Sequence, residues 1–219
     1  MNLLHQTWSL FRKELLLEYR QRYAISGICL YVFSTVFVVY MAAIKPTPPV
    51  WNSLFWIIVL FTSINALVKS FVQESSARQL YYYSLVDPLA ILLSKTLYNV
   101  LLLLVLSGLA YFTFSVVAGN PVKDTGQFLT ALGLGSLGLG ICLTFVSAVA
   151  NKTNNSATLL AILGFPLIIP ILLELLKLSA NALRLMQDTS ILNDIYLLLA
   201  IDALLLGLGL VLFPFLWRD

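Results

Sequence analysis

The chain has 219 residues, of which 60% are hydrophobic and 11% are charged, and its mean hydropathy is +0.92. Soluble domains are about 45–50% apolar and about 25% charged, so this composition excludes an ordinary soluble protein and predicts one that lies in lipid. The net charge of +3 comes from scattered basic residues and gives no support to a nucleic-acid-binding function.

Residues 1–22 predict an amphipathic arm rather than a cleavable signal peptide, because charged residues interrupt the apolar core that a signal peptide needs. Five side chains recur at helical spacing and share one face: Leu4, Trp8, Phe11, Leu15 and Tyr19. This pattern indicates a helix in the inner membrane interface, with its apolar face in the acyl chains and its cations at the headgroups. The alternative is a cytoplasmic extension of the first membrane span.

Six stretches are long and apolar enough to cross a membrane, which takes about 20 residues. They are residues 23–44, 51–72, 96–118, 127–150, 156–177 and 193–217. We therefore predict an all-α polytopic membrane protein with six transmembrane helices. Residues 1–219 are expected to form one transmembrane domain, because no Gly-, Ser- or Pro-rich linker divides them.

Basic residues predict the orientation, because short cytoplasmic loops are enriched in Lys and Arg. If the N-terminus is cytoplasmic, nine of the 13 Lys and Arg residues fall on the cytoplasmic side. We therefore expect both termini in the cytoplasm, which agrees with an even number of spans. Three tryptophans near the expected span ends are predicted to anchor at the membrane interfaces: Trp51, Trp56 and Trp217.

The connection at residues 73–95 is predicted to lie in the cytoplasm. Its first half is polar, and three consecutive tyrosines follow, at positions 81–83. Tyrosines of this kind can anchor at lipid headgroups, and they can also form a surface for a soluble partner, since Tyr is enriched at interface hot spots. The residues themselves leave both interpretations open.

Small residues on the fourth span predict close helix packing. Steps of three or four keep Gly133, Ser136, Gly140 and Thr144 on one helical face. Because lipid gives no hydrophobic drive between helices, small residues that let two backbones approach supply the packing instead. We expect this helix at the centre of the bundle or at a dimer seam.

The fifth span carries Pro166 and Pro170, each of which removes a backbone donor. A break in the helix there would mark a functional site, whereas a kink would only shape the bundle. Glu174 follows one turn later, near enough to the expected span end for its carboxylate to reach the interface.

Asp202 is the most deeply placed ionisable residue of the spans, about 14 Å into the sixth span at ~1.5 Å per residue. A charge at that depth is costly. We expect this carboxyl group to face the bundle, to be protonated, or to find a polar partner such as Asn65 or Asn99.

No catalytic machinery is visible, because the chain has no P-loop, HExxH, GxSxG or CxxCH motif. Its one histidine, His5, lies on the arm, and Cys29 and Cys142 are expected to pack as buried thiols. We therefore predict a protein that is no enzyme and that binds no metal or cofactor of its own.

Three features follow one another along the chain. They are the arm Phe11-Arg12-Lys13-Glu14-Leu15, a connection with Glu74 and a later Asp87-Pro88 turn, and Pro166-x-x-x-Pro170 in the fifth span. In this order they resemble the CcmB family, the haem exporter protein B family of cytochrome c maturation. The resemblance covers essentially the whole chain.

The resemblance implies a homodimeric ABC-2-type permease in a bacterial inner membrane, working with a CcmA-like ATPase. Hydrolysis of ATP by that partner would drive haem delivery or release of the haem-loaded chaperone, together with CcmC-like, CcmD-like and CcmE-like membrane proteins. Residues 73–88 would match the coupling helix, with four docking residues: Glu74, Arg78, Tyr81 and Tyr82. Four others would shape the central and outer bundle: Pro166, Pro170, Glu174 and Asp202.

Two other functions stay open on the sequence. One is an ABC-2 permease that exports another hydrophobic or lipid-linked substrate. The other is a secondary transporter that couples transport to protons through Asp202 and needs no ATP.

Overall fold

A computed structural model describes residues 3–20, 22–43, 45–67, 86–150, 156–186 and 191–218. These residues form seven α-helices and contain no strand. In chain order the helices are α1 (Leu3–Arg20), α2 (Arg22–Ala42), α3 (Pro48–Leu67), α6 (Pro88–Ala118), α7 (Thr125–Ala150), α8 (Ser156–Ala182) and α9 (Ile191–Arg218). The predicted all-α class is confirmed.

Five helical stretches are long and apolar enough to cross a membrane: Pro48–Leu67, Pro88–Ala118, Thr125–Ala150, Ile162–Ala182 and Ile191–Phe215. Within α2, Ser26–Ala42 forms a shorter apolar helix. A polytopic membrane protein is therefore confirmed, and the shorter stretch in α2 stands where the first of the six predicted spans was expected.

The helix α6 begins earlier than the sequence analysis placed the third span. Residues 88–95 were assigned to the cytoplasmic connection, but they form the first turns of α6. The Asp87 carboxylate caps this helix by accepting a hydrogen bond from the Leu89 amide at 2.9 Å, and Pro88 suits the first turn. The sequence analysis placed the start of the span after Lys95, which is 4% exposed within α6. The cytoplasmic placement of residues 88–95 stays a prediction.

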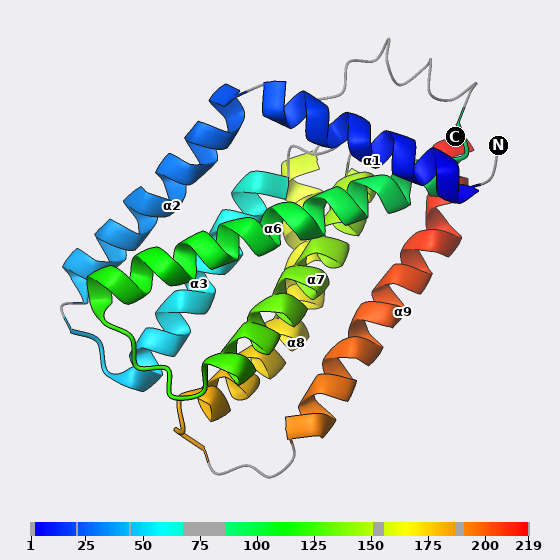
Figure 1. Ribbon diagram of the computed structural model, residues 1–219. Helices are drawn as coiled ribbons and strands as arrows, with labels where there is room; N and C mark the ends of the chain where they lie inside the picture. Colours follow the sequence, from blue (N-terminus) through cyan, green and yellow to red (C-terminus); the bar gives the residue numbers. More distant parts are fainter. Residues whose placement is uncertain are drawn as a thin grey trace.

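The helices run between two ends of a bundle (Figure 1). The helix α1 lies across one of them, which we call the α1 end; there α3, α7 and α9 end, and α6 and α8 begin. At the opposite end, which we call the far end, lie the connection between α2 and α3 and the connection between α6 and α7. Consecutive spans are therefore antiparallel.

The helix α7 occupies the centre of the bundle, where it contacts α3, α6, α8 and α9. Two of its glycines lie against neighbouring helices. A Cβ atom at Gly135 would stand 2.8 Å from the Trp56 ring of α3, and one at Gly140 would stand 3.1 Å from the Val100 Cα of α6. Absence of these side chains permits the close backbone approach on which helix packing in lipid depends.

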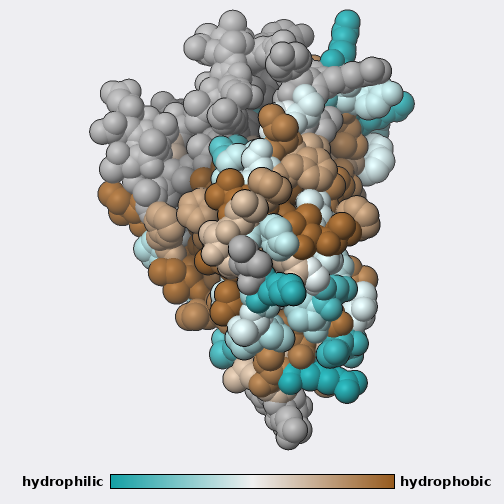
Figure 2. All heavy atoms as spheres, turned by 90° about the vertical axis from the view of Figure 1, so that its left-hand side faces the viewer, coloured by the Kyte–Doolittle hydropathy of each residue, from teal (hydrophilic) through white to brown (hydrophobic). Residues whose placement is uncertain are grey.

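The side of the bundle formed by α2 is largely apolar in its middle (Figure 2). Hydrophobic side chains cover that zone, and hydrophilic ones gather toward the far end. Among the described side chains of α2, the large apolar ones that are exposed are Leu30, Phe33, Phe37, Val38 and Met41. An apolar surface of this kind suits contact with acyl chains or with another membrane helix.

Candidate functional site

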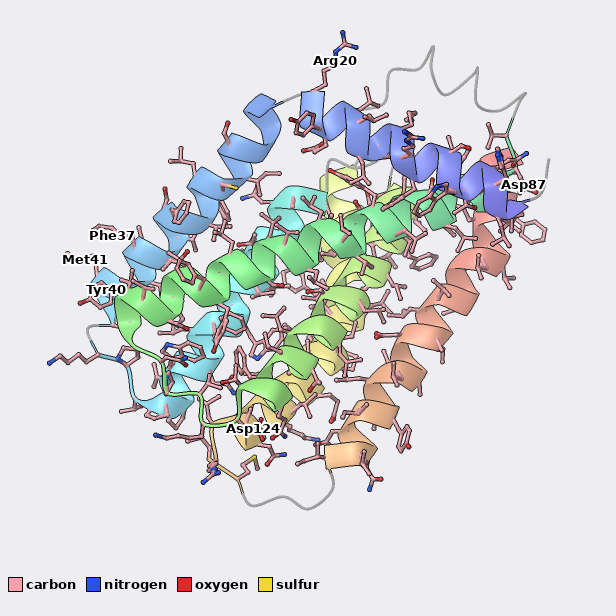
Figure 3. The ribbon with its side chains drawn as sticks, in the orientation of Figure 1. Arg20, Phe37, Tyr40, Met41, Asp87 and Asp124 are labelled. Atoms are coloured by element: carbon pink, nitrogen blue, oxygen red, sulfur yellow. The ribbon has the colours of Figure 1, made fainter. Side chains whose placement is uncertain are left out.

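At the α1 end, the start of α6 is fastened to α1. The Asp87 amide donates a hydrogen bond to the Gln6 side-chain oxygen at 3.3 Å. Farther along both helices, the Tyr98 hydroxyl hydrogen-bonds to the Glu18 carboxylate. Between these two links, Leu10 packs on a small apolar cluster of Ile91, Leu92, Ala148 and Phe213. The beginning of α6 therefore has a fixed place beside α1 (Figure 3).

The four predicted docking residues, Glu74, Arg78, Tyr81 and Tyr82, lie outside the described residues. Their role stays a prediction. The segment that contains them joins the last residue of α3 to the capped start of α6, and both of these points lie at the α1 end (Figure 1).

Three of the four small residues singled out on α7 contact α6. Ser136 Oγ lies 3.0 Å from Ser107 Oγ, and the Asn99 amide nitrogen donates to Thr144 Oγ1 at 2.8 Å. Gly140 lies against Val100, whereas a Cβ atom at Gly133 would meet nothing within 4 Å. Ser136, Gly140 and Thr144 therefore lie in the contact between α6 and α7, and Gly133 does not.

The helix α8 continues through Pro166 and Pro170, so the described chain shows no break at these residues. Both prolines are exposed, whereas Glu174 is 9% exposed and accepts a hydrogen bond from Lys177 at 2.8 Å. The second carboxylate oxygen of Glu174 has no hydrogen-bond partner among the described residues. The prolines are therefore exposed, and Glu174, one turn after Pro170 on the same helix, is buried.

Asp202 faces the interior of the bundle and is 2% exposed. Neither carboxylate oxygen has a hydrogen-bond partner in the described part of the chain. Of the two polar partners considered from the sequence, Asn65 is exposed on α3 and Asn99 bonds to Thr144. The carboxyl group lies against Gly138 of α7, where a Cβ atom would stand 2.6 Å from Asp202 Oδ1.

Sequence reasoning missed a buried aromatic cluster in the half of the bundle toward the far end. Ring centroids are 5.1 Å apart for Trp51 and Phe114, and 4.9 Å apart for Tyr111 and Phe128. Trp51 and Trp56 are 0% and 2% exposed, so the prediction that they anchor in the lipid interface was wrong. They pack inward because α3 turns its aromatic face toward α6 and α7; the i, i+4 spacing of Trp51 and Phe55 was the available signal. The Trp217 side chain lies outside the described part.

Within the described residues, no group of three or more His, Cys, Asp or Glu side chains could hold a metal ion. His5 is exposed on α1, Cys142 is buried and Cys29 is partly buried. The described residues thus contain contacts between helices, a start of α6 that is held against α1, and isolated buried polar groups.

Comparison with protein families shows the family of this membrane protein. The family model for the CcmB protein matches residues 5–216. The chain belongs to the CcmB family. Among the curated proteins, no relative matches it. CcmB is the membrane component of the ABC-type haem exporter for cytochrome c maturation. This function stands in place of the two rivals, an unrelated ABC-2 exporter and a secondary transporter.

Membership of the CcmB family also shows which subunit of the complex this chain is. CcmB is the permease subunit, and the ATPase activity belongs to CcmA. The chain is therefore a multi-pass protein of a bacterial inner membrane that works in the Ccm complex with partners such as the CcmA ATPase. The absence of an ATP-binding motif agrees with this assignment.

Proposed function

We propose that this CcmB subunit receives the CcmA ATPase at the α1 end, on residues 73–88, with that end in the cytoplasm. Glu74, Arg78, Tyr81 and Tyr82 make the contact, and movement of the docked ATPase reaches the bundle through α6. Hydrolysis of ATP then drives release of the haem-loaded chaperone, with CcmC-, CcmD- and CcmE-like proteins as membrane partners.

The fastening of α6 to α1 carries the proposal. A capped helix that begins at the last residue of the docking segment transmits a displacement along its length. This helix contacts α1, α2, α3, α7 and α9, so a push at its start reaches most of the bundle. Charge supports the orientation, because Arg12, Lys13 and Arg20 lie at the α1 end, where the positive-inside rule expects basic residues.

Charge reversal in the docking segment tests the proposal. The double variant Glu74→Lys with Arg78→Glu keeps the net charge but inverts the local pattern. We expect CcmA to co-purify with it in mild detergent at least about tenfold less than with the wild-type chain, since a lost charge pair at an interface costs up to several kcal/mol. Maturation of c-type cytochromes should fall in parallel.

A matched control swaps two charges in the connection between α8 and α9, namely Arg184→Glu with Asp188→Lys. This variant also keeps the net charge, and it should retain CcmA. Recovery of CcmA at the wild-type level with the docking variant would remove residues 73–88 from the proposed contact.

We also propose that two copies of the subunit pair through α2. Phe37 and Met41 point outward from this helix (Figure 3). Beside them, a groove of about 380 Å³ lies between α2 and α6, lined by Phe33, Ser34, Val36, Phe37, Thr113 and Val117. Side chains of α2 from a second copy would fill such a groove, because helix association in lipid depends on van der Waals packing.

Disulfide cross-linking tests the pairing. In a chain whose native cysteines are replaced by alanine, Phe37→Cys should give a dimer on mild oxidation in the membrane. Leu204→Cys, on an exposed position of α9, is the control and should stay monomeric. A dimer from the α9 variant alone would place the seam elsewhere.

A further inference from the structure

The helix α1 separates its charges between two sides. Glu18 bonds to the Tyr98 hydroxyl of α6, and Glu14 also lies close enough to act on that hydroxyl. Arg12 and Arg20 are exposed, and Arg20 projects away from the bundle in Figure 3. The acidic side chains are thus turned toward α6, and the surface that α1 presents outward is positive.

An exposed apolar face runs beside these cations. Leu4, Trp8 and Tyr19 are 80%, 64% and 70% exposed. At 3.6 residues per turn they fall within an arc of about 60°, and Arg12 follows Tyr19 directly around the helix. Large apolar side chains left open next to exposed guanidinium groups match the border between acyl chains and headgroups.

The cationic side of α1 is hollowed. A groove of about 350 Å³ is lined by Ser9, Arg12, Lys13, Leu16, Leu17 and Arg20. Arg12 and Arg20 are about 12 Å apart along the helix axis, and the apolar side chain of Leu16 lies between them in sequence. Guanidinium groups hold phosphate oxygens by charge-assisted hydrogen bonds, and leucines accept the adjoining acyl carbons.

We propose that α1 binds anionic phospholipid through Arg12 and Arg20, with the acyl chains against Leu4, Trp8 and Tyr19. The two links to α6, at Gln6 and Glu18, hold the helix at one rotation, so the cations and the apolar face keep their places. A lipid uses both faces at once, whereas a water-soluble partner would leave the apolar face uncovered. The lipid is selected by its negative headgroup.

Quenching of Trp8 fluorescence by brominated lipid tests the proposal. The full chain, carrying Trp217→Phe, is reconstituted in zwitterionic bilayers that contain a small fraction of either brominated phosphatidylglycerol or brominated phosphatidylcholine. Trp51 and Trp56 are buried, and a Trp8→Phe sample measures their contribution. We expect phosphatidylglycerol to quench Trp8 at least about threefold more per lipid than phosphatidylcholine, because each basic residue near the surface attracts anionic lipid.

The double variant Arg12→Gln with Arg20→Gln should bring this ratio close to one, and Arg12→Lys with Arg20→Lys should keep most of it. Lys123→Gln with Arg184→Gln removes the same charge at the far end and should leave the ratio unchanged. A wild-type ratio of one would overturn the proposal. It would also be overturned if Arg12→Gln with Arg20→Gln kept the ratio but lost CcmA, which would assign the cationic side to the ATPase.

Discussion

Gly138 of α7 and Asp202 of α9 are in contact in the interior of the bundle. The Asp202 carboxyl group occupies the space that a side chain at residue 138 would need. A Cβ atom at residue 138 would stand 2.6 Å from Oδ1 and 3.4 Å from Cγ of Asp202, and 3.3 Å from Ile171 Cγ2 of α8. The helices α7, α8 and α9 therefore meet at Gly138, where there is room for the hydrogen atom of glycine but not for a methyl group. The contact makes both residues part of the same packing unit.

Gly138→Ala should destabilise the bundle by about 1–3 kcal/mol, as overpacking of a filled core does. Because the clash is with the Asp202 carboxyl group, Asp202→Ala should relieve most of it, and the double variant should lose less stability than the two single variants together. The midpoint of thermal unfolding in detergent measures the effect. Gly133→Ala is the control: nothing lies within 4 Å of a Cβ atom there, so this variant should unfold no earlier than the wild type.

The hydrogen bond from Asn99 to Thr144 joins α6 to α7 and should contribute a measurable coupling. Bonds of this kind between membrane helices are worth about 0.6 kcal/mol on average and ~1.7 at most. A double-mutant cycle of Asn99→Ala and Thr144→Val in an SDS unfolding titration should therefore give a coupling energy in that range. Thr144→Ser keeps the hydroxyl acceptor and should retain the coupling; a cycle that sums to zero would show that the bond is not made in the folded protein.

Much of this bundle could be predicted from apolar content, because the length of a span is set by the bilayer and not by its neighbours. The rotation of each helix about its own axis could not be predicted in this way. Trp51 and Trp56 lie near a span end, where tryptophans often face lipid, yet α3 turns them inward. The helix α6 begins at Pro88, ahead of the predicted third span, because Lys95 ends the uninterrupted apolar run and not the helix that Asp87 caps. The docking residues came from family resemblance, and the contact of Gly138 with Asp202 was not predicted, because the sequence gives no distance between residues of different helices.

The indole of Trp56 should depend on Ser179 for its place between α3 and α8. Its Nε1 donates to Ser179 Oγ at 2.8 Å, with both residues buried. Ser179→Ala removes the acceptor and leaves a buried donor unsatisfied, which costs about 1–3 kcal/mol. Thermal unfolding should show this loss of stability when Ser179→Ala is compared with the wild type. The loss should be much smaller when Ser179→Ala is added to a Trp56→Phe variant, which has no indole donor. Equal losses in the two backgrounds would mean that Ser179 acts through packing and not through this bond.

The proposed orientation predicts which connections a membrane-impermeant thiol reagent can reach. In a chain with Cys29→Ala and Cys142→Ala, Lys123→Cys lies in the exposed connection between α6 and α7 at the far end and should be labelled in cells with a permeabilised outer membrane. Ser76→Cys should be labelled only after the inner membrane is opened, because residues 73–88 are placed with the cytoplasmic ATPase. Both variants must first be shown to react fully in detergent, which separates a shielded thiol from one on the other side. Labelling of Ser76→Cys from outside would reverse the orientation, and CcmA, which hydrolyses ATP in the cytoplasm, could then not dock on this segment.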